Sequence, residues 1–225
     1  MQIIPVIDLK DGQVVHAVRG ERSTYKPIHL HSILTASSAF EDVLNAFLTF
    51  YPFKTFYIAD LNAICGMGDH AELIRNVLKQ HPDREFWVDN GRQLDSVSVD
   101  YPKNYNAIIA TESQQAMPQQ IDERFILSLD YKQQALGHVD WFMQSDYWPA
   151  RIIVMTLARV GSQAGPDFEK LQLLKKSFPV KQFIAAGGVR NGQDLHALEN
   201  LGMSGVLLAT ALHTGAIRAS DISGR

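Results

Sequence analysis

Two aspartates stand at corresponding points of the chain, each at the end of a short apolar run. Asp8 follows the apolar pair in VIDLK and Asp130 stands in LSLDYK, an offset of 122 residues. A buried, unpaired carboxylate costs several kcal/mol, so an acid at the end of an apolar strand is expected to meet water, a donor or a substrate. Two such acids can act as general acid and general base when their surroundings separate their pKa values. In the alternative, each aspartate caps a loop or pairs with a nearby base, Lys10 or Lys132.

Turns of small residues follow two later apolar runs. Gly187 and Gly188 follow one run, and Ala209 and Thr210 follow the next. Backbone N–H groups exposed by such turns, beside a helix N-terminus, bind phosphate. Because any tight loop needs glycine, the pattern takes its weight from the two consecutive turns. These four residues are predicted to bind a phosphate group.

The first half of the chain carries equivalent turns. Gly91 stands in VDNGR, which resembles AAGGVR around Gly188, and IIAT, which ends at Ala110 and Thr111, resembles LLAT. Gly91, Ala110 and Thr111 are therefore predicted to form a second phosphate site. Asp89 adjoins this turn, and its negative charge would repel a phosphate, which makes this the weaker of the two sites.

The elements that must position these residues are short and continuously apolar. Such runs are typical of strands that are covered on both faces, as in a parallel sheet. Eight strands are expected: Ile3–Asp8, Thr55–Asp60, Glu85–Val88, Ala107–Ile109, Phe125–Leu129, Arg151–Val154, Gln182–Ala185 and Gly205–Leu208.

Helical patterns separate these strands. One begins near Ser38, which has the spacing of a capping box with Glu41. The segments after the third, fourth and fifth strands are poorly periodic, so short helices are expected there. Eight strands alternating with helices predict an α/β fold, a single (β/α)8 TIM barrel over residues 1–225, with the strand ends opening onto one mouth. A doubly wound open sheet is the alternative, but no Gly-x-Gly-x-x-Gly follows the first strand.

The three internal matches occur in the same order in both parts of the chain. Their offsets are 122, 97 and 99 residues, so the two parts carry unequal insertions. This self-similarity predicts two half-barrel repeats, of about residues 1–115 and 116–225.

Composition excludes several classes of function. A net charge of −3 provides no broad basic surface, so nucleic acid is not expected as a partner. The single cysteine, Cys65, excludes an internal disulfide framework and fits a reducing compartment. No apolar run reaches the roughly 18 residues of a membrane span, so no membrane partner and a cytoplasmic location are expected. The histidines show no recognised metal spacing, and no metal is predicted.

Six segments together resemble the HisA/HisF family of histidine biosynthesis. They are IIPVIDLKDGQVVHAVRG, IADLNAI, LSLDYK, GPDFE, AAGGVR and GVLLATALHTG, which cover nearly the whole chain in order. The resemblance implies a (β/α)8 barrel of two half-barrels. It also implies an Amadori rearrangement, in which a ribosyl aminoaldose carrying two phosphates becomes a ketose without a cofactor.

The resemblance assigns roles to the residues above. Asp8 matches the proton-abstracting acid of the first strand, and Asp130 matches the partner acid of the fifth. The turn at Gly187, Gly188, Ala209 and Thr210 matches one phosphate site, and Gly91, Ala110 and Thr111 match the other.

Several positions depart from the family pattern. Met155 stands where a catalytic threonine is expected, with Thr156 one place along, and Val160 replaces a loop aspartate. Asp89 stands in a run expected to be three glycines, and Ala209 begins a step expected to be Gly-Arg or Gly-Lys. The GERSTYKPI segment looks more like a shorter HisA-related branch of methanogens and methylotrophs.

Four further residues are predicted as possible substrate contacts because they end or follow predicted strands. They are Arg19, Asp60, Thr156 and Arg159. Arg19 and its neighbour Arg22 lie on a loop that could close over an anion, and Arg159 could clamp a phosphate. Solvated loops and local salt bridges are the alternatives.

The sequence thus predicts a HisA-like phosphosugar isomerase that uses an Asp8/Asp130 acid–base pair on a phosphorylated small molecule. One alternative is a related barrel enzyme acting on a different, singly phosphorylated molecule, including one from C1 or methanopterin-linked metabolism. Another is a barrel that binds a ligand without catalysis. No prediction of oligomeric state follows.

Overall fold

The strands of the protein close into a barrel, which confirms the predicted architecture. The computed structural model describes residues 1–94, 102–115 and 123–223. Each of the eight predicted strands is present within these residues. The barrel strands are β1 Gln2–Lys10, β4 Thr55–Asp60, β5 Glu85–Asp89, β6 Tyr105–Ala110, β7 Ile126–Tyr131, β8 Arg151–Thr156, β9 Gln182–Ala186 and β10 Gly205–Leu208.

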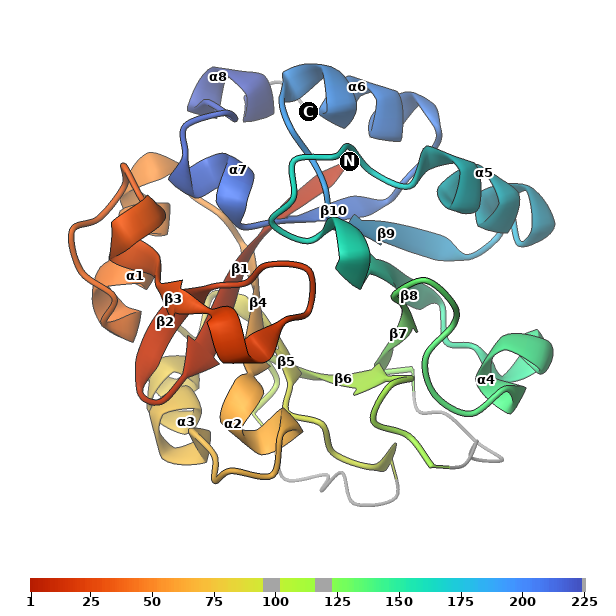
Figure 1. The fold of residues 1–225 in the computed structure, drawn as a ribbon, viewed down its shortest axis with the longest axis horizontal. Helices are drawn as coiled ribbons and strands as arrows, with labels where there is room; N and C mark the ends of the chain where they lie inside the picture. Colours follow the sequence, from red (N-terminus) through yellow and green to blue (C-terminus); the bar gives the residue numbers. More distant parts are fainter. Residues whose placement is uncertain (95–101, 116–122, 224–225) are drawn as a thin grey trace.

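The strands run parallel and in sequence order around the barrel (Figure 1). The first and last strands pair directly, with Ile4 opposite Leu207, so the sheet has no open edge within the barrel. This closure rules out the doubly wound open sheet. It also brings the C-terminal ends of all the barrel strands to one mouth.

Helices connect the strands on the outside (Figure 1). The described helices are α1 Phe40–Phe50, α2 Leu61–Ile64, α3 Ala71–Gln80, α4 Asp140–Met143, α5 Phe168–Ser177, α6 Gly192–Asn200, α7 Thr210–His213 and α8 Ala219–Ile222, with 3-10 turns η1 Arg22–Thr24, η2 Ile28–His31, η4 Ser145–Tyr147 and η5 Leu157–Arg159. After β7, the short helix α4 confirms the expectation from poor periodicity. Residues 95–101 and 116–122, where two more short helices and the half-barrel boundary were expected, lie outside the described residues. Among the helices of the described part of the chain, none has the length and apolar character needed to cross a bilayer.

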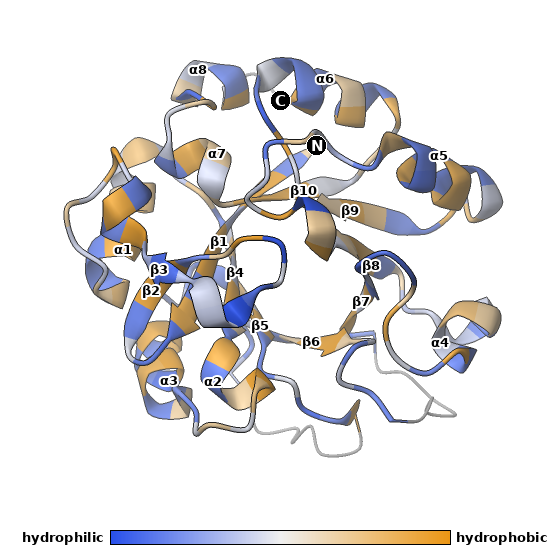
Figure 2. Cartoon of the chain, in the orientation of Figure 1, coloured by the Kyte–Doolittle hydropathy of each residue, from blue (hydrophilic) through white to orange (hydrophobic). Residues whose placement is uncertain are grey.

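The barrel strands bury side chains on both faces, which explains their continuously apolar sequences. On β8, Ile153 packs inside the barrel, whereas Ile152 and Val154 pack outward against the helices. Apolar side chains from strands all around the barrel fill its interior, among them Ile4, Trp87 and Ile184. In Figure 2 the barrel strands are largely coloured as hydrophobic, and the loops are mostly hydrophilic.

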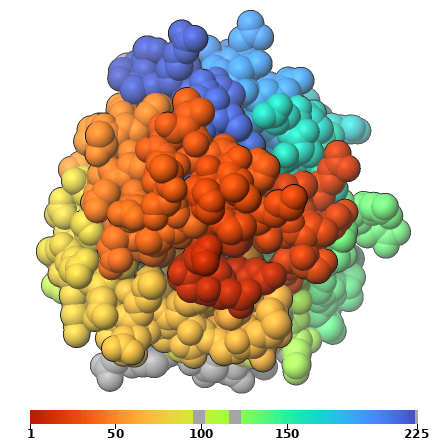
Figure 3. All heavy atoms as spheres, turned by 60° about the vertical axis from the view of Figure 1, so that its left-hand side comes forward, coloured from red at the N-terminus to blue at the C-terminus, as the bar shows by residue number. Residues whose placement is uncertain are grey.

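A small hairpin that the sequence did not predict extends beyond β1. Its strands are β2 Gln13–His16 and β3 Lys26–Pro27, and we call residues 13–27 the mouth hairpin. In Figure 3 the red and orange N-terminal residues border both the yellow segment and the dark blue C-terminal segment.

The segment after the hairpin corrects the predicted capping box. The Ser38 hydroxyl accepts the backbone N–H of His29 at 3.1 Å, so it is not used at the helix. Helix α1 begins at Phe40 after Ala39, with no side-chain cap.

Candidate active site

A cavity lies where the barrel strands end at the mouth, partly covered by the mouth hairpin. Six of the predicted site residues line it together: Asp8, Asp130, Gly187, Gly188, Ala209 and Thr210. The mouth hairpin contributes Arg22 and Tyr25 to the same lining. Closure of the barrel therefore places the two strand-end acids and the second-half turns around one space.

Asp8 is half-buried at the end of β1. Among the described residues, none hydrogen-bonds its carboxyl group. Burial raises the pKa of Asp8 to about 7, an effect that Arg22 opposes and Asp89 reinforces. A carboxyl group without fixed partners and with a pKa near neutrality is suited to accept and release a proton.

Asp130 is held by three hydrogen bonds at the end of β7. The Ser128 hydroxyl donates to Oδ1 at 2.7 Å, and the Thr111 hydroxyl and the Glu112 N–H donate to Oδ2 at 3.2 and 3.1 Å. Burial raises its pKa to about 8, although the bond from Ser128 lowers it. Asp130 therefore keeps its proton at neutral pH and can act as an acid.

Thr111 lies behind this acid and outside the cavity lining. The Thr111 hydroxyl also accepts the Asp130 N–H at 2.9 Å, so it bonds both the backbone and the carboxyl group of Asp130. The structure thus places Thr111 where it fixes the Asp130 carboxyl, whereas the sequence predicted a phosphate contact. Ala110 is buried in the barrel interior.

Asp89 occupies the first-half turn that was predicted to bind phosphate. Its Oδ1 accepts the Gly91 N–H at 3.1 Å, and its Oδ2 accepts the Tyr57 hydroxyl at 3.2 Å. Burial raises the pKa of Asp89 to about 6, against the lowering effect of the Gly91 hydrogen bond. Gly91 itself is packed against the Ile64 backbone and does not line the cavity. The N–H expected to meet a phosphate is therefore already bound to a carboxylate.

The second-half turn has the opposite character. Gly187 and Gly188 have φ of 102° and 88°, which favours glycine, and both line the cavity. A Cβ on Gly188 would lie 2.3 Å from the Gly165 carbonyl oxygen, so the backbone here needs glycine. The residues of the second-half turn that line the cavity are Gly187, Gly188, Ala209 and Thr210, and none of them carries a carboxylate.

Several residues that line the cavity were not among the predicted contacts, among them Arg22, Glu112 and Tyr57. Arg22 forms an ion pair with Glu112, which joins the mouth hairpin to the end of β6, and both line the cavity. The loop that carries Arg22 was predicted to meet an anion, but its partner Glu112 is 90 residues away in the chain. Tyr57 projects into the barrel beside Asp89, and the alternation of β4 is the signal that could have indicated it.

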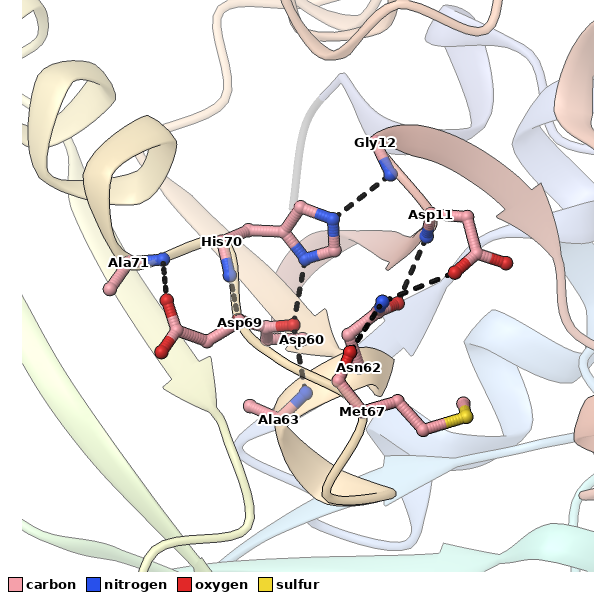
Figure 4. Close-up of polar contacts among 9 residues, drawn as sticks. All are labelled: Asp11, Gly12, Asp60, Asn62, Ala63, Met67, Asp69, His70 and Ala71. Carbon is pink, nitrogen blue, oxygen red and sulfur yellow. Dashed lines mark hydrogen bonds and ion pairs between the residues drawn. The ribbon is translucent and has the colours of Figure 1, made fainter.

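Asp60 is buried but does not line the cavity, and it belongs to a hydrogen-bond network of its own (Figure 4). Its carboxylate accepts the N–H of Ala63 and of His70, and its Oδ1 lies 2.8 Å from His70 Nδ1. His70 Nε2 in turn accepts the Gly12 N–H at 3.0 Å. This strand-end aspartate therefore fixes the turn after β1 and does not face the cavity.

The other predicted contacts also lie outside the cavity lining. Arg159 Nη1 donates to the carbonyl groups of Gly165 and Pro166, which holds that loop in place. Arg19 is exposed, and Thr156 is buried while its neighbour Met155 lines the cavity. Side chains alternate along β8, so the one that faces the cavity is the apolar Met155, and the neighbouring Thr156 is turned away.

The raised pKa of Asp8 predicts a dependence of stability on pH. The folded protein holds a proton that the unfolded chain, with an ordinary pKa of 3.8, releases, so stability falls as pH rises from about 4 to about 7. Asp8→Asn remains neutral and is expected to be about 1 kcal/mol more stable than the native protein at pH 8, or about 3 °C in Tm. It should have no such advantage at pH 4. Thermal unfolding at the two pH values measures this, and an equal difference at both would exclude ionisation as the cause.

Comparison with known proteins matches almost the entire chain. The model of the family described as "Histidine biosynthesis protein" matches residues 2–218. An uncharacterized protein of Methanocaldococcus jannaschii is 34% identical over 99% of this chain and 97% of its own.

Bacterial enzymes are similar over the same length. Two proteins named 1-(5-phosphoribosyl)-5-((5-phosphoribosylamino)methylideneamino) imidazole-4-carboxamide isomerase cover 99% of this chain and 97% of their own: that of Streptococcus sanguinis is 26% identical, and that of Listeria welshimeri is 27% identical. Isomerases are thus among the proteins that this chain resembles along its length.

Proposed function

Because the chain belongs to the histidine biosynthesis protein family, we propose that it is an aldose–ketose isomerase of a phosphorylated ribosyl amine. The observation that carries this proposal is the pair of strand-end carboxyl groups, Asp8 and Asp130, that line one cavity with pKa values raised to about 7 and about 8. The names of the bacterial relatives supply the substrate class.

The order of the two pKa values supports a division of roles. Asp130, still protonated at pH 7.5, would donate its proton to the ring oxygen as the bond from that oxygen to C1 breaks and an imine forms. Asp8, largely ionised at that pH, would then remove the proton from C2 and leave an enolamine. As the C2 ketone forms, C1 would gain a proton from Asp8 and the C2 hydroxyl would return one to Asp130, so both carboxyl groups regain their starting states. Each step is a proton transfer by a positioned carboxyl group, so the reaction requires no cofactor.

A phosphate group of the substrate would bind at Gly187, Gly188, Ala209 and Thr210. These residues line the cavity at the ends of β9 and β10, where this fold commonly binds phosphate. They offer backbone N–H groups and a hydroxyl in a region that carries no carboxylate of its own.

The acid–base pair predicts a bell-shaped pH profile. The value of kcat/KM is expected to rise up to about pH 7, as Asp8 loses its proton, and to fall above about pH 8, as Asp130 loses its own. Initial rates at subsaturating substrate from about pH 5 to pH 10 measure this. A profile without an alkaline limb would contradict the role of Asp130 as acid.

A second candidate is an enzyme of the same barrel that acts on a singly phosphorylated molecule. The specific observation in its favour is Asp89, whose carboxylate accepts the Gly91 N–H at the first-half turn. A second phosphate placed there would meet a buried acid in place of free N–H groups.

The decisive experiment is a turnover assay with the substrate named for the bacterial relatives, compared with inorganic phosphate binding to the same protein. Turnover would support the isomerase and two tolerated phosphates. Phosphate binding without turnover would favour the singly phosphorylated substrate, and neither turnover nor phosphate binding would contradict both candidates.

A further inference from the structure

A histidine outside the cavity contacts the predicted phosphate turn from the mouth hairpin. His16 is the last residue of β2, and its Nε2 lies 3.0 Å from the hydroxyl oxygen of Thr210. Thr210 lines the cavity, whereas His16 does not. The hydrogen bond to Thr210 therefore connects His16 to the cavity.

The neighbouring contacts keep this histidine in place. The His31 ring lies 4.5 Å from the His16 ring, centroid to centroid. Next along the same segment, the Ser32 hydroxyl lies 2.9 Å from His213 Nδ1, and the Ile33 N–H donates to the His213 carbonyl. The mouth hairpin and the residues after it are thus fastened to helix α7, which begins at Thr210.

The direction of the hydrogen bond between His16 and Thr210 decides whether the threonine hydroxyl can donate its hydrogen to a ligand in the cavity. A neutral imidazole carries its hydrogen on one of its two nitrogens. With the hydrogen on Nε2, His16 donates to Thr210 Oγ1, and the hydroxyl hydrogen remains available to a ligand. With the hydrogen on Nδ1, the threonine hydroxyl donates to the histidine instead. Within residues 1–94, 102–115 and 123–223, His16 is the side chain that the Thr210 hydroxyl contacts.

The charge around the cavity makes this donor important. Four acids line it, Asp8, Asp89, Glu112 and Asp130, and the cation in the described lining, Arg22, is paired with Glu112. A phosphate at the second-half turn therefore depends on neutral donors, since no lysine or arginine of the described lining lies on β9 or β10. Burial and the nearby His31 lower the pKa of His16, which favours the neutral ring, and Lys26 opposite it on β3 and His213 are the other titratable groups beside it.

We propose that His16 is a positioning residue for the substrate phosphate: its Nε2–H donates to Thr210 Oγ1 and orients the threonine hydroxyl as a donor into the cavity. This inference rests on the proposed phosphate site at Gly188 and Thr210. It adds to that site a residue of the mouth hairpin, 194 residues distant in sequence.

Binding of inorganic phosphate to the full chain tests the proposal. His16→Phe keeps a ring beside His31 but removes the donor, and it is expected to weaken phosphate binding about tenfold. Thr210→Val removes the hydroxyl at nearly equal volume and should cause a similar loss. His16→Gln, whose amide can donate from a position close to that of Nε2, should restore the affinity to within about threefold of the native value.

The double variant separates positioning from a general structural effect. If the histidine acts through the hydroxyl, His16→Phe combined with Thr210→Val should bind phosphate no more weakly than Thr210→Val alone. Losses that multiply would overturn the proposal. NMR of the His16 ring nitrogens gives a second readout that does not depend on variants: the Nε2–H tautomer is expected, and the Nδ1–H tautomer would overturn it.

The outcomes also distinguish the inference from the proposed function. Phosphate binding that responds to Thr210→Val but not to His16→Phe would reject the role of His16 and leave the phosphate site intact. If the Thr210→Val variant bound phosphate as tightly as the native protein, the phosphate site itself would be contradicted, and the role of His16 with it.

Discussion

Replacing Asp130 by asparagine is expected to lower kcat for the proposed isomerisation by about 10³-fold. The amide keeps the shape of the side chain and can still accept the bonds from Ser128 or Thr111. It cannot supply a proton to the ring oxygen, so the loss should fall on kcat and leave KM within a few-fold of the native value. Steady-state rates at pH 7.5 measure both parameters, and Asp8→Asn is expected to cause a loss of similar size.

Asp60→Asn is the matched control for this substitution. Asp60 is also a buried aspartate at the mouth end of a barrel strand, but it is bonded to His70 and does not line the cavity. Its replacement should lower Tm and leave kcat within a few-fold of the native value. Equal activity losses for Asp60→Asn and Asp130→Asn would indicate that burial of charge, and not proton transfer, accounts for the effect.

Gly137→Ala is expected to destabilise the fold by about 3 kcal/mol, or about 9 °C in Tm, because strain and overpacking add. Gly137 has φ of 99°, and a Cβ built there would lie 1.8 Å from the Thr111 carbonyl oxygen. The loop after β7 must therefore move away from the residue that holds the Asp130 carboxyl. We expect the alkaline limb of the pH profile, which reports on Asp130, to shift in the same variant.

Gly68→Ala separates the clash from the backbone strain. Gly68 has φ of 93°, close to that of Gly137, but nothing lies within 4 Å of an added Cβ. Its replacement is expected to cost about 1 kcal/mol, the strain alone. Equal losses of stability in the two variants would show that the close approach to Thr111 adds nothing to the cost of a side chain at Gly137.

Local features of the sequence were sufficient for the architecture. Each barrel strand is continuously apolar because the helices cover one face and the barrel interior buries the other, and this pattern can be read without knowing which strands pair. The same reasoning placed Asp8 and Asp130 at the mouth, because the end of a parallel barrel strand has one location. The half-barrel repeat remains a prediction from the three internal matches.

The partners of polar side chains could not be predicted in this way. Gly91 and Thr111 stand in the expected turns, yet Asp89 binds the Gly91 N–H and Asp130 binds the Thr111 hydroxyl. Ser38 has the spacing of a helix cap but accepts the N–H of His29, because the unpredicted hairpin brings that residue beside it. In each case the sequence contains several residues that could bond the same polar group, and it does not show which one does.

What the sequence by itself determined is therefore the barrel and the position of its acids along the strands, since both follow from burial and from the alternation of side chains. Only the tertiary structure decided which polar groups face the cavity. Arg22 meets Glu112 and His16 meets Thr210 across 90 and 194 residues of chain, and Asp60 is withdrawn into the network with His70. A hydrogen bond depends on the distance and direction between two specific atoms, and those are fixed only when the closed barrel brings the loops of distant strands together.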